Sequence, residues 1–103
     1  MAPAEPTLPD DAHLVELRFE HVTFRSRRRV APGTVLAFDL VMEGRPWPVS
    51  APVVTCVTKK DAGASLFEMR ISLEDIPAGD RRLIALFIEK GRGSPQLAPA
   101  RTR

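Results

Sequence analysis

Four arginines crowd the segment FRSRRRVAPGT, residues 24–34, and they are the residues best suited to bind a ligand: Arg25, Arg27, Arg28 and Arg29. Guanidinium groups donate forked hydrogen bonds that match phosphate and carboxylate groups, so the cluster could bind an anion. Alternation along a strand would instead put Arg28 on one side and the other three on the opposite side, as on a solvated edge that resists unwanted strand pairing. We prefer the solvated edge and keep anion binding as the alternative.

Other candidates for chemistry are few. Cys56 lies between Thr55 and Val57 in an apolar run, which favours a packing role over a nucleophilic one. His13 and His21 are eight residues apart with no evident third ligand, and they are expected at the surface. No serine hydrolase set, paired-acid site, HExxH motif or phosphate loop occurs. The sequence therefore predicts no enzyme activity, no bound metal and no cofactor.

Trp47 is the only tryptophan of the chain, and it is framed by Pro46 and Pro48. An exposed tryptophan on a stiff strand edge would be a natural anchor for a binding partner. A lid over the core is the alternative, and the sequence does not choose between the two.

The 103 residues, 44% of them apolar, suit a single domain, and the formal net charge is only +2. One cysteine excludes an internal disulfide, and no apolar run approaches the roughly 18 residues of a membrane span, so we expect a cytoplasmic protein without membrane insertion. Proline-rich residues 1–12 read as a flexible leader and residues 91–103 as a flexible basic tail. Residues 13–90 are the expected folded unit.

Alternating apolar residues predict four or five short antiparallel strands within that unit. The first apolar run changes phase between Phe19 and Val22, which requires a bulge or bend near Glu20 and His21. Pro48 and Pro52 put the start of a later strand at an edge or a bulge. The inward-facing sets are Val15, Leu17 and Phe19, then Leu36, Phe38, Leu40 and Met42, then Phe67, Met69, Ile71 and Leu73.

Helical spacing follows in IPAGDRRLIALFIEKG, residues 76–91, with apolar residues at Leu83, Ile84, Phe87 and Ile88. Gly91 lies where a helix C-cap would be. The sequence thus predicts a mostly β protein: a small antiparallel barrel with one C-terminal helix. The expected core between barrel and helix consists of Phe67, Met69, Ile71, Leu83 and Phe87.

The order of these segments resembles the PilZ domain, a bacterial barrel best known as a receptor for the second messenger cyclic di-GMP. The matching segments are VTFRSRRRVAPGTVLAFDLVMEG, then VVTCV, KKDAGA and FEMRI, and finally LEDIPAGDRRLIALFI, which leads into the helix. The resemblance covers about residues 15–88. It implies a PilZ-like barrel and a place in cyclic di-GMP signalling, surface motility or pilus assembly.

The ligand motifs of PilZ receptors are altered here. The family binds cyclic di-GMP with an R-x-x-x-R segment and a D/N-x-S-x-x-G segment, and the second falls on ELRFEH, residues 16–21. Glu16 replaces the Asp or Asn, Arg18 the Ser and His21 the Gly, while the leader contains no arginine. A histidine side chain would occupy the space that glycine leaves for the ligand. We therefore expect that the usual ligand site is lost.

From the resemblance and the lost motifs we expect a non-catalytic regulatory or adaptor module that binds a protein or a second copy of itself, in part through Trp47. The alternative is a cyclic di-GMP receptor that uses Arg25 to Arg29. A second alternative is nucleic-acid binding by a small barrel. The phenylalanines that would have to stack on bases are expected on the apolar faces of the strands and helix, and this disfavours nucleic-acid binding.

Overall fold

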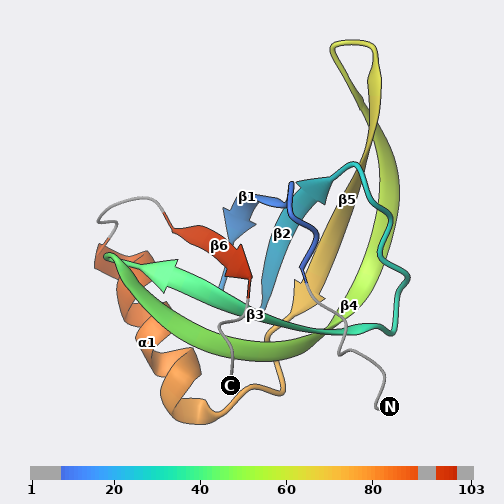
Figure 1. The fold of residues 1–103 in the computed structure, drawn as a ribbon. Coiled ribbons are helices and arrows are strands. Elements are labelled where there is room, and N and C mark those ends of the chain that lie inside the picture. The colour runs from blue at the N-terminus through green and yellow to red at the C-terminus, as the bar shows by residue number, and fades with distance from the viewer. Residues whose placement is uncertain (1–7, 91–94, 100–103) are drawn as a thin grey trace, which may run out of the picture.

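The computed structural model describes residues 8–90 and 95–99, which form one antiparallel sheet and one helix (Figure 1). The six strands are hydrogen-bonded in the order β1-β2-β5-β4-β3-β6. The elements are β1 (His13–Leu17), β2 (His21–Ser26), β3 (Val35–Met42), β4 (Arg45–Asp61), β5 (Ala64–Ser72), α1 (Ala78–Lys90) and β6 (Gln96–Pro99). The protein is thus mostly β with a helix near the C-terminus, as the sequence predicts.

The sheet curls into a half-barrel because β4, at 17 residues, belongs to both of its halves. The first part of β4, residues 45–52, pairs with β3, and the part from Val53 onward pairs with β5. A register shift between Val53 and Thr55 marks the change, and Figure 1 shows β4 sweeping around the sheet there. The outer strands β1 and β6 contact each other without hydrogen-bonded pairing between their described residues, so the barrel stays open.

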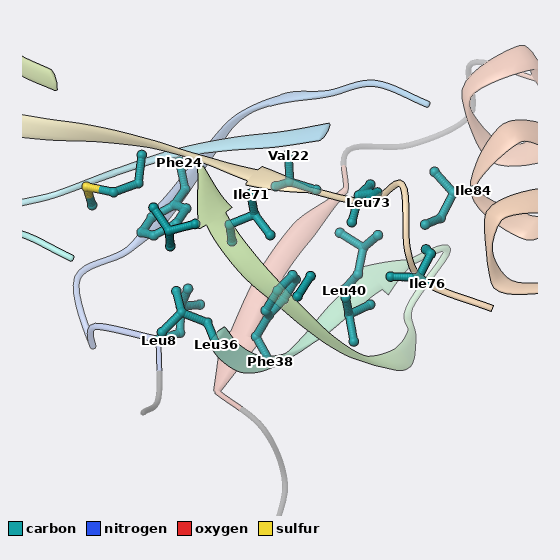
Figure 2. Packing of buried hydrophobic residues seen from close by; sticks show 14 of the residues in the cluster. Leu8, Val22, Phe24, Leu36, Phe38, Leu40, Ile71, Leu73, Ile76 and Ile84 are labelled. Carbon is teal, nitrogen blue, oxygen red and sulfur yellow. The ribbon is translucent and has the colours of Figure 1, made fainter. Parts of the chain in front are cut away.

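The core fills the inside of this curl, as Figure 2 shows. The inward set predicted for β3 is confirmed, because Leu36, Phe38, Leu40 and Met42 are all buried, although Ala37 and Asp39 between them are buried as well. Met69, Ile71 and Leu73 of the β5 run are buried too, and they meet Val22 and Phe24 of β2. Phe67, expected in the core, is only half-buried against it.

The predicted change of phase near Glu20 and His21 is a full reversal of the chain. A turn after β1 separates it from β2, and the Arg18 amide donates to the His21 carbonyl at 2.9 Å. A register shift between Leu14 and Glu16 also moves the apolar residues of β1. The inward set predicted as Val15, Leu17 and Phe19 is therefore wrong: Val15 and Phe19 are exposed, and Leu14 and Leu17 pack on the core.

Helix α1 closes one end of the half-barrel with Ile84 and Phe87, which are buried. Asp80 in its first turn and Lys90 in its last turn suit the helix dipole. The prediction that Leu83 is a core residue is wrong, since 37% of its surface is exposed. The proposed C-cap, Gly91, lies outside the described residues.

Parts of both predicted terminal segments are ordered against the sheet. Leu8 is buried in the core, although it belongs to the segment expected as a flexible leader. Gln96–Pro99, expected in the flexible tail, forms β6 and pairs with the free side of β3. Residues 1–7, 91–94 and 100–103 of those segments lie outside the description.

Candidate functional site

A groove of about 540 Å³ lies between α1 and the hairpin formed by β3 and β4. Its lining mixes five apolar side chains with three charged ones, Glu43, Arg45 and Lys90, which we call its rim. It is lined by Met42, Glu43, Arg45, Trp47, Leu83, Leu86, Phe87 and Lys90. The groove therefore joins two segments about 40 residues apart in the sequence.

Helix α1 supplies one wall because its apolar stripe is wider than the core requires. Leu83, Leu86, Phe87 and Lys90 recur at the i, i+3, i+4 and i+7 spacing of a single helical face. Only Phe87 of these is buried, and Leu83 and Leu86 leave 37% and 44% of their surfaces exposed. The helix thus presents apolar surface to the groove that its own packing leaves open.

The hairpin supplies the opposite wall through a tight two-residue turn. Glu43 and Gly44 have φ of 53° and 77°, the pattern of a type I′ turn, and glycine adopts such an angle without strain. The turn pairs Met42 with Arg45, and Trp47 then faces inward with Val49. Met42 and Trp47 are thereby brought opposite the leucines of α1.

Trp47 lies between the two positions that the sequence leaves open, a lid over the core and an exposed side chain. It packs against the core cluster and remains half-buried rather than enclosed. It also lines the groove, together with a smaller space near Val49, Leu83 and Ile84. Its indole is therefore both part of the end of the core and accessible from the groove.

The edge of β4 next to this groove is poorly suited to accept another strand. The two-residue turn makes Met42 and Arg45 a hydrogen-bonded pair, and such pairs alternate along an antiparallel hairpin. The backbone N–H and C=O groups therefore point away from β3 at positions 46, 48, 50 and 52. Three of these four residues are prolines, which have no N–H to donate. This fits the edge position predicted from Pro48 and Pro52.

The rim of the groove carries more positive than negative charge. Arg45 and Lys90 line the groove with one acid, Glu43, and a second acid, Asp80, lines the smaller space that adjoins it. The ion pairs within the described part of the chain involve other residues, Arg18 with Glu16 and Arg25 with Glu68. The two cations of the rim are therefore available to a partner.

The arginine cluster is not gathered into one site. β2 ends at Ser26, so the predicted strand alternation does not extend through Arg27, Arg28 and Arg29, which are exposed in the following loop. Arg25 lies on β2, where its Nε donates to Glu68 Oε1 at 3.2 Å. Arg28 and Arg29 line a separate cavity of about 280 Å³ next to Pro9 and Leu36, to which Arg25 does not contribute.

The Asp11 carboxylate of the same chain is bound at the start of the arginine loop that follows β2. Ser26 Oγ donates to Asp11 Oδ1 at 2.5 Å, and the Arg27 amide donates to Asp11 Oδ2 at 2.8 Å. The Arg28 amide in turn donates to Ser26 Oγ at 3.0 Å. These hydrogen bonds lower the pKa of Asp11, with the larger effect from the Ser26 hydroxyl and the smaller from the Arg27 amide. Asp11 thus fastens the segment before β1 to the end of β2.

This contact makes stability depend on pH. Because the pKa of Asp11 is lower in the folded than in the unfolded state, the contact stabilises the fold above the ordinary carboxyl pKa. The contribution is lost as pH falls through the folded value. Asp11→Asn should lower the free energy of unfolding by about 1 kcal/mol near neutral pH, a modest value for an exposed carboxylate, and by less in acid.

Urea denaturation at several pH values measures this effect, with Asp10→Asn as the matched control. Asp10 is exposed and its side chain has no partner among the described residues. Equal destabilisation by the two variants at neutral pH would show that the Asp11 contact does not hold the segment.

Glu16, Arg18 and His21, which the sequence resemblance sets against the ligand motif of PilZ receptors, lie together around the β1–β2 turn. Arg18 Nε donates to Glu16 Oε1, so these two charges neutralise each other. That hydrogen bond is the main cause that lowers the pKa of Glu16, with smaller contributions from the charges of Arg18, His21 and Arg70. His21 Nε2 is buried without a hydrogen-bond partner among the residues that the structure describes. The positions form an internal ion pair beside a histidine.

The remaining sequence candidates show packing or surface positions. Cys56 is half-buried against the core, with its Sγ 3.5 Å from Met69 Sδ. His13 is exposed, and no group of three His, Cys, Asp or Glu among the described residues could hold a metal ion. Helix α1, the helix in the described ranges, is too short to cross a membrane.

Sequence reasoning found Trp47 but missed the rest of the groove. Leu86 is the residue in the sequence that could have indicated the groove. Together with Leu83 it makes the apolar stripe of the helix wider than the buried face of Ile84 and Phe87. That Arg45 and Lys90 meet at one rim depends on how the helix lies against the hairpin, which no local pattern encodes.

Comparisons of the chain with protein-family models, with curated proteins and with solved structures each gave no match.

Proposed function

We propose that this chain is a non-catalytic, PilZ-like regulatory or adaptor module that binds another protein through the groove between α1 and the β3–β4 hairpin. The observation that carries the proposal is the half-exposed apolar surface of Trp47, Leu83 and Leu86, gathered in one concavity. Tryptophan is among the residues that most often dominate the binding energy of protein interfaces, and the centres of such interfaces are apolar. A role in bacterial cyclic di-GMP signalling, motility or pilus assembly follows from the PilZ resemblance and belongs to the same proposal. So does the cytoplasmic location, which follows from the single cysteine and the lack of a long apolar run.

The polar features of the chain support protein binding over a nucleotide receptor. Arg25 is engaged by Glu68, and the start of the arginine loop holds the Asp11 carboxylate. Arg28 and Arg29 share a cavity about half the size of the groove. These arginines do not converge on one site that could hold two phosphates and two guanines.

Photo-crosslinking in cells of the encoding organism tests this function. A benzophenone amino acid at position 86 would lie in the groove, and the same residue at position 54, an exposed valine of β4, is the control. We expect position 86 to form a discrete adduct with another protein and position 54 to form none. The absence of an adduct at 86, or the same adducts at both positions, would remove the groove as a docking site.

A second test addresses cyclic di-GMP directly. We expect titration calorimetry of the wild-type protein to show no binding at low micromolar concentration, because the motif positions are replaced and Arg25 is paired. A PilZ receptor with intact motifs serves as the positive control. A micromolar isotherm that is lost in Arg25→Ala and Arg29→Ala would favour the receptor alternative instead.

A further inference from the structure

The groove has features that restrict the kind of segment it could take, and the following inference rests on the proposed function. Peptides dock on folded domains chiefly by adding a strand to a sheet edge or by laying an amphipathic helix in a groove. Strand addition needs a row of backbone donors and acceptors along the edge. Pro46, Pro48 and Pro52 remove three of the four outward N–H groups of β4 there. The edge therefore disfavours an added strand.

A helix fits the remaining surface. α1 has 13 residues, or about 20 Å of helix, and its groove-facing residues span two turns from Leu83 to Lys90. A partner helix lying alongside it would place apolar side chains at i, i+3 or i+4, and i+7 over Leu83, Leu86 and Trp47. A face of this kind is what helix-in-groove recognition requires.

The charges indicate what should border that apolar stripe. Arg45 on the hairpin and Lys90 at the end of the helix stand on the rim of the groove, and neither is in an ion pair with a described residue. One carboxylate, Glu43, lies on the same rim, and the other nearby one, Asp80, lies in the smaller space beside Trp47 and Leu83. Complementary charges across an interface speed association and select the partner. The rim therefore favours acidic over basic flanks.

We propose that the groove takes an amphipathic helix of a partner protein whose apolar stripe is bordered by Asp or Glu residues. Its leucine- or phenylalanine-like side chains would rest on Trp47, Leu83 and Leu86, and its carboxylates would meet Arg45 and Lys90. The partner is thereby defined as an acidic helical segment, not an extended strand.

Two synthetic 15-residue helical peptides without tryptophan test the proposal. Both carry leucines at i, i+3, i+4 and i+7; the flanking positions hold glutamate in one and lysine in the other. Trp47, the only tryptophan of the chain, reports binding through its fluorescence. We expect the acidic peptide to bind at least ten-fold more tightly than the basic one, and added salt to weaken it.

Charge reversal on the protein completes the design. Arg45→Glu with Lys90→Glu should reverse the preference in favour of the lysine peptide. Lys59→Glu with Lys60→Glu, which makes the same change of net charge at the exposed β4–β5 hairpin, should leave the preference for the acidic peptide in place. A reversal produced equally by both double variants would mean that net charge, not the rim, selects the peptide, and it would overturn the proposal.

The other outcomes are also decisive. Equal binding of both peptides, abolished by Leu86→Glu, would overturn the acidic preference while leaving protein docking in the groove intact. Binding of neither peptide would overturn the inference, and a missing crosslink at position 86 would overturn the proposed function as well. Leu86-dependent binding to vesicles of phosphatidylglycerol, without peptide binding, would identify the surface as a membrane contact and also overturn the inference.

Discussion

Phe38→Ala lowers the free energy of unfolding by about 3–5 kcal/mol if the half-barrel is held together as described. The Phe38 ring has no exposed surface, and its strand is paired on both sides, with Val49 of β4 and Pro99 of β6. Removing the ring leaves a cavity where both neighbouring strands meet the core. Small domains have total stabilities of roughly 5–15 kcal/mol, so this variant should be close to unfolding at room temperature.

Phe19→Ala is the matched control for this prediction. Phe19 lies in the β1–β2 turn with 52% of its surface exposed, and its loss should cost less than about 1 kcal/mol. Urea denaturation followed by circular dichroism measures both variants. Similar shifts of the midpoint for the two phenylalanines would contradict the described core.

Leu83→Glu combined with Leu86→Glu should weaken binding of the crosslinked partner by about 100-fold, because each change puts a carboxylate where a partner would bury apolar surface. The free protein should lose about 1–2 kcal/mol of stability, less than a core substitution costs, since 37% and 44% of the two leucine surfaces are exposed in it. Affinity by surface plasmon resonance and stability by urea denaturation separate the two effects.

Val35→Glu combined with Val54→Glu is the control for that pair. These valines are 51% and 46% exposed and lie away from the groove lining. The control should keep the affinity of the wild type. An equal loss of affinity in both double variants would show that exposed apolar surface in general, rather than the groove, binds the partner.

The strands with a clear period of two could be predicted from sequence because burial on one face of a sheet imposes that period. Met69 and Ile71 follow it in β5. The apolar residues Leu36, Phe38, Leu40 and Met42 follow it in β3, although Ala37 and Asp39 between them are also buried. The first apolar run was harder, because the bulge in β1 and the turn after it both change the phase. Simple alternation therefore predicts Val15 and Phe19 inward, whereas both are exposed.

Other parts of the fold depend on tertiary pairing that leaves no local mark. The short segment Gln96–Pro99 carries no alternation, yet it pairs with β3 because that strand offers an open side. Leu8 comes from a proline-rich stretch and is buried because the curl of the sheet provides a place for it. Of the candidate site, Trp47 was visible as an unusual residue, whereas the groove around it required the position of α1.

The central claim, that the groove is the protein-binding surface, is tested most directly by the indole N–H resonance of Trp47 in a two-dimensional ¹⁵N NMR spectrum. A single tryptophan gives one such signal, well separated from the backbone amides. Addition of the partner captured from position 86 should shift this signal together with the amides of Leu83 to Lys90, and leave those of Arg27 to Arg29 unchanged. Shifts confined to the arginine loop, with the Trp47 signal unmoved at saturation, would contradict the account.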